Sequence, residues 1–473
     1  MERHFSLRQA GLLFDPAYHP DLPITSFRNK IMSLLSLPNS LQVAIIDFLP
    51  TAHDVASLRL VNHDLAVLAR PRLYHHFYTG DAAPTRRVRR LLRLIHCDRS
   101  LAAHIGSASM TWDVAEGREY GEDSDSDSDS DSDGEAVEGY TAAELAKDYA
   151  VWESVTQVLG PARSLHMDPR KYPTSRSKAY DNICVPLLLC QLPNLRTLRV
   201  STFASRFAVF ATDPAIRVWG LNPLYSLQTL FWTSTNTEKG FHINHLLPLL
   251  VGAPRLQVLH AEYACAHWPD DHPDIWMRAS EKWLDTFMAR RKMEFLTEIE
   301  FLNCSISGAW FTWFFAYTPR LARFAYRHCE TNYSPVFSAT EFRRALRVVK
   351  DTLEEIQIEH ETFEPLGSIG PFTDFPKLRS IKTDFCLLVD EEETKGKLVD
   401  VLSPGLKTLC LVNDIHSDSM FFTQLAEVVE TKGKGLMKEL VDVKTESSHD
   451  YGEEELLKTG LEVACDEFGV RLG

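Results

Sequence analysis

The nine residues LPNLRTLRV, from Leu192 to Val200, decide the fold because their pattern recurs along the chain. An apolar residue is followed by two others, a second apolar residue, one further residue and usually a third apolar one. Seven later segments repeat this order at gaps of 25 to 40 residues. The leading leucines of the eight segments are Leu195, Leu227, Leu256, Leu296, Leu321, Leu353, Leu378 and Leu406. Such a repeat predicts stacked structural units instead of one closed core.

The repeat resembles the leucine-rich repeat, whose period is about 20–29 residues and whose strands line the inside of a horseshoe. Stretches with helical spacing precede three of the repeat strands: His242–Val251, Ser338–Val349 and Phe421–Glu430. Strand and helix alternating at this period imply an α/β solenoid, a curved parallel sheet with helices on its outer side. We further expect a first strand near His104–Asp113, a second at 160–168, and a capping helix and strand within 453–472.

Side chains alternate along a strand, so the residues between the apolar positions should point to the concave face. Their charge changes sign from strand to strand, ending with Lys382 beside Asp384. Either these charges simply pair with each other, at about 0–1 kcal/mol a pair, or a charged target peptide displaces the pairs. Phe231 would then be the best single anchor, since aromatic residues dominate interfaces. The candidate target-binding residues are Phe231, His260, Glu298, Glu300, Arg323, Arg327, Glu355, Glu359 and Lys382.

The nine cysteines form no C-x-x-C pair, which argues against a zinc ribbon or a thioredoxin-like site. Cys304, Cys329 and Cys386 each lie eight residues after a leading leucine, where the leucine-rich repeat places Asn or Cys. Cys265 is one position late in its repeat. We expect small buried side chains whose weak S–H meets a turn carbonyl, in place of a redox or catalytic role.

The stretch from Leu35 to Tyr74 has helical apolar spacing. Its first stripe holds Leu41, Ile45, Phe48 and Leu49, and its second holds Leu58, Val61, Leu65 and Leu68. We expect Asp54 to cap the second helix and Pro71 to end it. So few residues cannot bury both stripes among themselves. The stretch is therefore either a helical cap on the following domain or a surface that a partner covers.

Leu37-Pro38, Ile45, Leu49-Pro50, the run 58–62 and the run 71–74 fall in the order and spacing of an F-box. The segment resembles the F-box of fungal proteins in particular. The resemblance implies binding to the small S-phase kinase-associated adaptor of a cullin-RING ubiquitin ligase, through helices laid into a groove. The implied adaptor-binding residues are Leu37, Pro38, Leu41, Ile45, Leu49, Leu58, Leu60 and Val61.

These resemblances imply an N-terminal extension at 1–30, an F-box at 31–80 and a solenoid at 81–473. The F-box would dock to the ligase through the adaptor and its cullin, while the solenoid holds a protein target. The chain itself would perform no bond chemistry, since presenting a target lysine near a charged ubiquitin carrier acts through proximity. The alternative is a non-catalytic scaffold that binds the adaptor outside a ligase, and an enzyme with a pocket in the solenoid comes third.

The segment GEDSDSDSDSDSDGE, Gly121–Glu135, has eight acidic residues and cannot bury anything. We expect a disordered insertion at about 116–139, between the first strand and a helix near 142–158. A more specific hypothesis for the segment is phosphorylation by an acidophilic kinase at Ser124, Ser126, Ser128 and Ser130. A basic cluster precedes this segment, at Arg86, Arg87, Arg89, Arg90 and Arg93, and is expected to be the solvated face of a helix.

The composition limits the remaining classes of function. The chain is 44% hydrophobic, enough for a large core, and its net charge of -15 argues against nucleic acid as the main partner. No run of about 18 apolar residues predicts a membrane span, and the start has no signal-peptide pattern. A reducing cytoplasm or nucleus is therefore expected. No catalytic, metal-binding or cofactor motif is found, so no enzyme activity, metal or cofactor is expected.

Overall fold

A computed structural model of the chain forms an α/β structure around one large parallel sheet. It describes residues 36–49, 51–79, 84–112, 185, 188–202, 224–235, 237, 240–266, 292–329, 337–360, 368–389, 397–413, 418–447 and 454–473. Four sequence predictions lie outside these residues: the extension at 1–30, the acidic insertion with its predicted phosphorylation sites, the helix near 142–158 and the strand at 160–168.

All eight repeat segments form strands. Each leading leucine is at most 1% exposed, and each strand begins two residues after it. Side chains then alternate between the core and the opposite face, as in β4, because the strand has a period of two. The bounds are β1 His76–Tyr78, β2 Ser107–Trp112, β3 Thr197–Thr202, β4 Thr229–Ser234, β5 Phe241–His242, β6 Val258–Glu262, β7 Ala264–Ala266, β8 Glu298–Ile306, β9 Arg323–His328, β10 Glu355–His360, β11 Ser380–Asp384, β12 Thr408–Asn413, β13 Asp442–Ser447 and β14 Arg471–Leu472.

The strands follow one another across the sheet in chain order, β1-β2-β3-β4-β6-β8-β9-β10-β11-β12-β13-β14, and these neighbours pair in parallel. The short strands β5 and β7 pair with each other, and β7 extends the pairing to β8. The predicted first strand is β2, and it pairs directly with β3. The sheet starts one strand earlier than predicted, because β1 pairs with β2. This strand lies within the range 31–80 that was predicted for the F-box.

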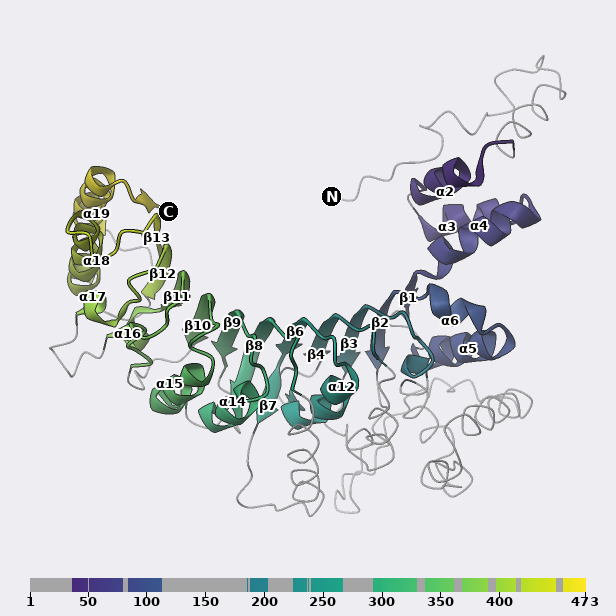
Figure 1. Cartoon of the computed structure of the whole chain (residues 1–473), viewed down its shortest axis with the longest axis horizontal. Helices are drawn as coiled ribbons and strands as arrows, with labels where there is room; N and C mark the ends of the chain where they lie inside the picture. The colour runs from purple at the N-terminus through teal and green to yellow at the C-terminus, as the bar shows by residue number, and fades with distance from the viewer. Residues whose placement is uncertain are drawn as a thin grey trace, which may run out of the picture.

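Helices cover the outer side of the curved sheet, which leaves the strands lining its concave side (Figure 1). The three predicted repeat helices are confirmed, as are the terminal helix and strand. Among the residues described after β2, the bounded helices are η3 Ile243–Leu246, α12 Leu247–Gly252, α14 Gly308–Phe315, α15 Ala339–Val348, α16 Phe385–Leu388, α17 Leu398–Val401, α18 Asp418–Gly433 and α19 Glu454–Phe468. This arrangement is compatible with the expected solenoid.

The core between sheet and outer helices is most aromatic beneath α14. Phe311 is fully buried, and its ring lies 5.3 Å from that of Phe324 and 5.0 Å from that of Phe342, centroid to centroid. Helices α14 and α15 approach closely here, since a Cβ on Gly308 would lie 2.5 Å from the Cβ of Glu341. Only glycine fits at this contact between the two helix N-termini.

The N-terminal helical unit consists of α2 Asn39–Asp47, α3 Ala52–Arg59 and α4 His63–Tyr74. The cap predicted at Asp54 is wrong, because Thr51 is the N-cap and its Oγ1 accepts the backbone N–H of Asp54 at 3.1 Å. The stop predicted at Pro71 is also wrong, since α4 runs on to Tyr74. Proline removes one hydrogen-bond donor but keeps a helical φ, so a last turn can still form.

The basic cluster lies on α5 Pro84–Cys97, which is followed by α6 Ser100–His104. Arg87 and Arg90 are exposed, as expected of a solvated face. Arg89 is buried, however, and Arg93 is half-buried, so the expectation of one solvated face is wrong for these two side chains. These two side chains lie four residues apart, so they share one face of the helix.

Candidate functional site

The concave face carries a continuous row of side chains across four neighbouring strands. Arg199, Phe231, His260 and Glu300 each lie four residues after a leading leucine, and the pairing register sets them opposite one another on β3, β4, β6 and β8. We call these four residues the inner row. Parallel strands lie about 4.8 Å apart, which brings each side chain against the next.

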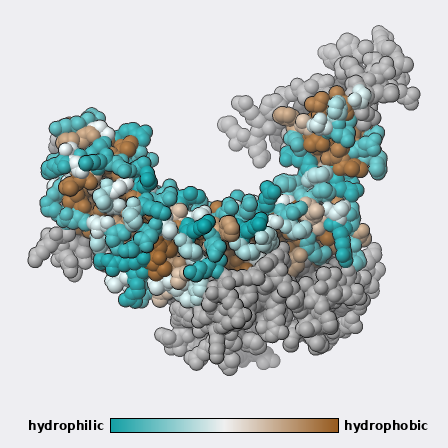
Figure 2. All heavy atoms as spheres, viewed as in Figure 1, coloured by the Kyte–Doolittle hydropathy of each residue, from teal (hydrophilic) through white to brown (hydrophobic). Residues whose placement is uncertain are grey.

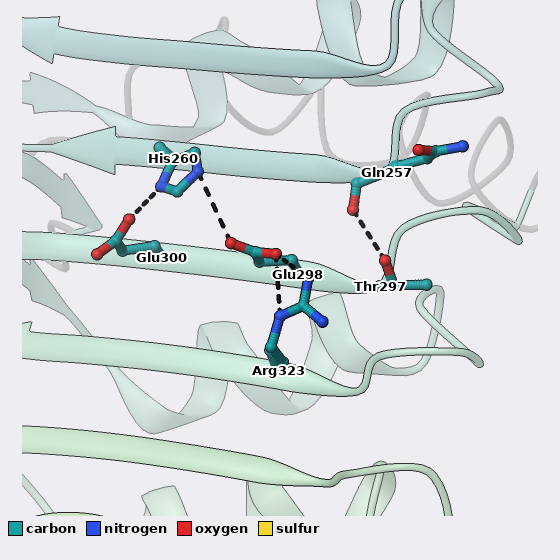
Figure 3. A network of polar contacts seen from close by, with 6 residues as sticks. All are labelled: Gln257, His260, Thr297, Glu298, Glu300 and Arg323. Carbon is teal, nitrogen blue, oxygen red and sulfur yellow. Dashed lines mark hydrogen bonds and ion pairs between the residues drawn. The ribbon is translucent and has the colours of Figure 1, made fainter.

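Each neighbouring pair of the inner row is in contact. The guanidinium carbon of Arg199 lies 3.8 Å from the centroid of the Phe231 ring. The rings of Phe231 and His260 are stacked, with centroids 4.5 Å apart and planes at 5°. His260 Nδ1 contacts a carboxylate oxygen of Glu300, and its Nε2 lies 3.9 Å from Oε1 of Glu298 (Figure 3). The row thus passes from a cation over two flat rings to a carboxylate.

A hollow of about 390 Å³ opens over the inner row. The side chains two residues further along the same strands, Ser201, Thr233, Glu262 and Leu302, continue its lining, and Thr111 of β2 extends it. Thr233 Oγ1 donates a hydrogen bond of 3.2 Å to Oε2 of Glu262. The hollow therefore combines hydroxyl groups and charges with one aromatic surface, a mixture typical of specific binding sites.

The charges around this hollow are not all neutralised. His260 and Glu300 pair with each other. Arg199 and Glu262 form no ion pair with any residue in the described part of the chain. The Arg199 charge reaches as far as β1: burial lowers the pKa of His76, and the nearby charges of His75 and Arg199 lower it further. A cation and a carboxylate are thus both available to a ligand in the hollow.

The next strands carry paired charges. Arg323 Nε donates to Oε2 of Glu298 at 3.0 Å (Figure 3). This hydrogen bond raises the pKa of Arg323, and the carboxylates of Glu298 and Glu355 raise it further. Glu355 lies opposite Arg323 in the register of β9 and β10. The predicted pairing across strands is confirmed at this point of the concave face.

Glu359 is the centre of a second group of charges. One of its oxygens lies 2.8 Å from Arg327, and the other lies 3.1 Å from Nζ of Lys382, which is also 2.9 Å from Glu446. Burial raises the pKa of Glu359, but the two cations outweigh burial and hold it below its ordinary value. Lys382 shows the opposite balance: burial lowers its pKa and the two carboxylates raise it above its ordinary value.

The nine predicted target-binding residues all lie on β4, β6 and β8 to β11, so the structure brings them together along the concave face. Asp384 does not join them. It is buried and accepts the backbone N–H of His360 at 2.7 Å, because the strand ends there and α16 begins. Sequence reasoning missed Arg199. The signal was present, since Arg199 stands in the same position of its repeat as Phe231.

A second candidate surface lies on the N-terminal helical unit, where apolar residues gather on the exterior (Figure 2). The exposed fractions are 51% for Leu41, 40% for Ile45, 88% for Phe48, 89% for Leu60 and 58% for Val61. Pro38 is also exposed, and Leu37 is half-buried. Leu49 and Leu58 instead pack against the small internal core of the unit, formed by Ile46, Val55 and Ala69. The expectation that the unit cannot bury both of its apolar stripes is confirmed.

The cysteines of the repeats behave as structural side chains. Cys304 is buried, its Sγ lies 3.1 Å from the carbonyl of Leu302, and burial raises the pKa of its thiol. Cys265 Sγ donates to the carbonyl of Phe241 at 3.4 Å, and burial raises its pKa to about 11. Cys329 and Cys386 are only half-buried, so the prediction of full burial is wrong for these two.

Comparison of the chain with models of protein families and with curated proteins gives no match. Within the described ranges, no group of three or more His, Cys, Asp or Glu side chains is placed to hold a metal ion. No helix among the described residues combines the length and apolar composition needed to cross a bilayer.

Proposed function

We propose that this chain is a substrate-recruiting subunit of a cullin-RING ubiquitin ligase. In this proposal α2–α4 form an F-box that binds the adaptor, and the concave sheet of a leucine-rich-repeat-like solenoid holds a protein target. The observation that carries it is the exposed apolar surface of the N-terminal helical unit. Burying one such side chain is worth about 1.5–3 kcal/mol, so a partner helix set against several of them would bind stably.

The position of the two surfaces supports a linking role. The N-terminal helical unit lies at one end of the curved sheet (Figure 1). The inner row lies on β3, β4, β6 and β8, away from that end. A partner on the helices leaves the concave face open to a target. Recruitment of this kind needs no bond chemistry in the chain, because it raises the effective concentration of a target lysine near the ubiquitin carrier.

The alternative is a scaffold that binds the adaptor without a ligase. Tagged full-length chain, purified from its native cell, separates the two. The ligase role predicts that both adaptor and cullin co-purify, and the scaffold role predicts the adaptor without cullin. A variant with Leu37, Pro38 and Ile45 changed to Ala should lose both partners but keep the circular dichroism spectrum of the sheet. Recovery of neither partner with the unaltered chain would overturn both roles.

The same proposal places the chain in the cytoplasm or nucleus. Its described cysteines are free thiols, from exposed Cys97 to buried Cys465, as expected in a reducing compartment.

A further inference from the structure

Arg199 and Glu262 differ from the other charged side chains of the hollow. The Glu300 carboxylate contacts the His260 ring, and the neighbouring Glu298 pairs with Arg323. Arg199 and Glu262 line the same hollow with opposite charges and have no ion pair among the described residues. A ligand that brings one charge of each sign would neutralise both.

The sheet sets the distance between these two charges. Arg199 is on β3 and Glu262 is on β6, with β4 between them. On β6, His260 is the residue level with Arg199, and Glu262 lies two residues after it along the strand. With strands about 4.8 Å apart and a rise of about 3.3 Å per residue, the two Cα atoms are about 10 Å apart across the sheet and about 7 Å along it. Their direct separation is about 12 Å.

Both side chains are arranged to accept a partner. One face of the Arg199 guanidinium lies on the Phe231 ring, and stacking leaves the N–H groups at its edge free to hold a carboxylate. Glu262 accepts one hydrogen bond, from Thr233 at its Oε2, so Oε1 remains for a cation. The intervening floor is the Phe231 ring and the Thr233 hydroxyl.

We propose that the hollow binds an extended peptide of the target with an acidic and a basic residue four positions apart. The acidic side chain binds Arg199, and the basic one binds Glu262. Residues four apart in an extended chain point to the same side and lie about 13 Å from each other, which matches the spacing of the two charges. The residue midway between them points to the same side and lies over Phe231 and Thr233. This assignment rests on the proposed function only in taking the concave face as the target surface.

A displayed peptide library tests the assignment with the full chain as bait. Two sites four positions apart carry acidic, basic or neutral residues in every combination, and the other positions are random. The unaltered chain should enrich peptides with one acid and one base about tenfold over peptides neutral at both sites. Arg199→Glu should shift the preference to two bases, and Glu262→Lys should shift it to two acids. The double variant should again prefer one acid and one base.

Matched controls reverse charge outside the hollow. Arg196→Glu and Glu294→Lys alter exposed residues next to β3 and β8 and should keep the original preference. If Arg199→Glu does not fold, Arg199→Gln should lose the preference for the acid and keep that for the base. The proposal is overturned if the unaltered chain enriches no such pair, or if all variants enrich the same peptides.

Adaptor binding, measured on the same preparations, separates this proposal from the ligase role. All of these charge variants should bind the adaptor normally. If the chain shows the charge switch but does not bind the adaptor, the ligase role falls and the peptide assignment stands. If it binds the adaptor but shows no charge switch, only the peptide assignment falls.

Discussion

Phe231 and His260 stack across two parallel strands, with their ring centroids 4.5 Å apart. The stack lies between two other contacts. The Arg199 guanidinium lies over the Phe231 ring, and the Glu300 carboxylate contacts Nδ1 of His260. Removing the central ring should therefore disturb both neighbours.

Phe231→Ala should destabilise the chain by about 1–2 kcal/mol, because a half-buried aromatic side chain and its stacking are lost. Urea unfolding followed by circular dichroism measures this cost. Phe231→Tyr keeps the ring and should stay within about 0.5 kcal/mol of the unaltered chain. Equal stability of the Ala and Tyr variants would show that the stack contributes nothing. Once a target is known, the Ala variant should also capture it less well, with adaptor binding unchanged.

Phe311→Ala should cost about 3–5 kcal/mol, since its ring is fully buried among the aromatic side chains beneath α14. Phe295→Ala provides the matched control, because that side chain is 46% exposed and should cost less than about 1 kcal/mol. Thermal and urea unfolding of the two variants give the comparison. A similar small cost for both would contradict the packing described for this part of the core.

His328 should make stability depend on pH. It is buried, its Nδ1 lies 2.8 Å from the hydroxyl of Tyr326, and its ring stacks on His360. Burial and then the His360 charge lower its pKa from 6.5 to about 3. The unfolded chain takes up this proton below about pH 6.5 and the folded chain does not, so stability is full above pH 6.5 and falls by up to about 1.4 kcal/mol per pH unit towards pH 3.

The variant His328→Gln removes this titration. Between pH 7 and pH 5 the unaltered chain should lose about 2 kcal/mol more stability than the variant does. The exposed His63 provides the control, since His63→Gln should keep the pH dependence of the unaltered chain. The burial of a neutral His328 is contradicted if the two variants respond to pH in the same way.

Glu359→Gln should cost about 1–3 kcal/mol, because it weakens charged contacts with both Arg327 and Lys382 on a side chain only 14% exposed. The cost should disappear as pH falls through the lowered pKa of Glu359, where the carboxylate takes up a proton in the unaltered chain too. Asp374→Asn breaks a more exposed pair with Lys350 and should cost about 0–1 kcal/mol. Equal costs in urea unfolding would show that Glu359 gains nothing from its two partners.

The repeat pattern predicts the strands β3, β4, β6 and β8 to β12, but β1, β5, β7 and β13 were not predicted. Leading leucines such as Leu195 are local in sequence and invariably buried, so the strand after each of them could be read directly. The concave position of Glu298 and Arg323 followed from the same two-residue period. Local signals failed where a tertiary contact decides the outcome. The burial of Arg89 and Asp384 depends on which segments pack over them.

The site was predictable only in part. The spacing of Phe231 and His260 placed them side by side, but their stacking and the Arg199 guanidinium on top depend on rotamers that the sequence does not specify. The hollow is lined by residues of β2, β3, β4, β6 and β8, so no single repeat encodes it. At the N-terminus, both helical stripes were visible in the sequence. Which leucines turn inward, such as Leu49 and Leu58, required the packing of α2 to α4.

Binding of the purified chain to purified S-phase kinase-associated adaptor, measured by calorimetry, tests the central claim most directly. Ile45→Asp and Leu60→Asp place a charge in the exposed apolar surface of the N-terminal helical unit, and each should weaken binding by at least about tenfold. Val463→Asp alters an apolar side chain on α19 that is 62% exposed, at the other end of the sheet, and should leave binding unchanged. A stable complex of the unaltered chain with this pattern of variants is the predicted result. No binding by the unaltered chain, or undiminished binding by both helical-unit variants, would contradict the proposal.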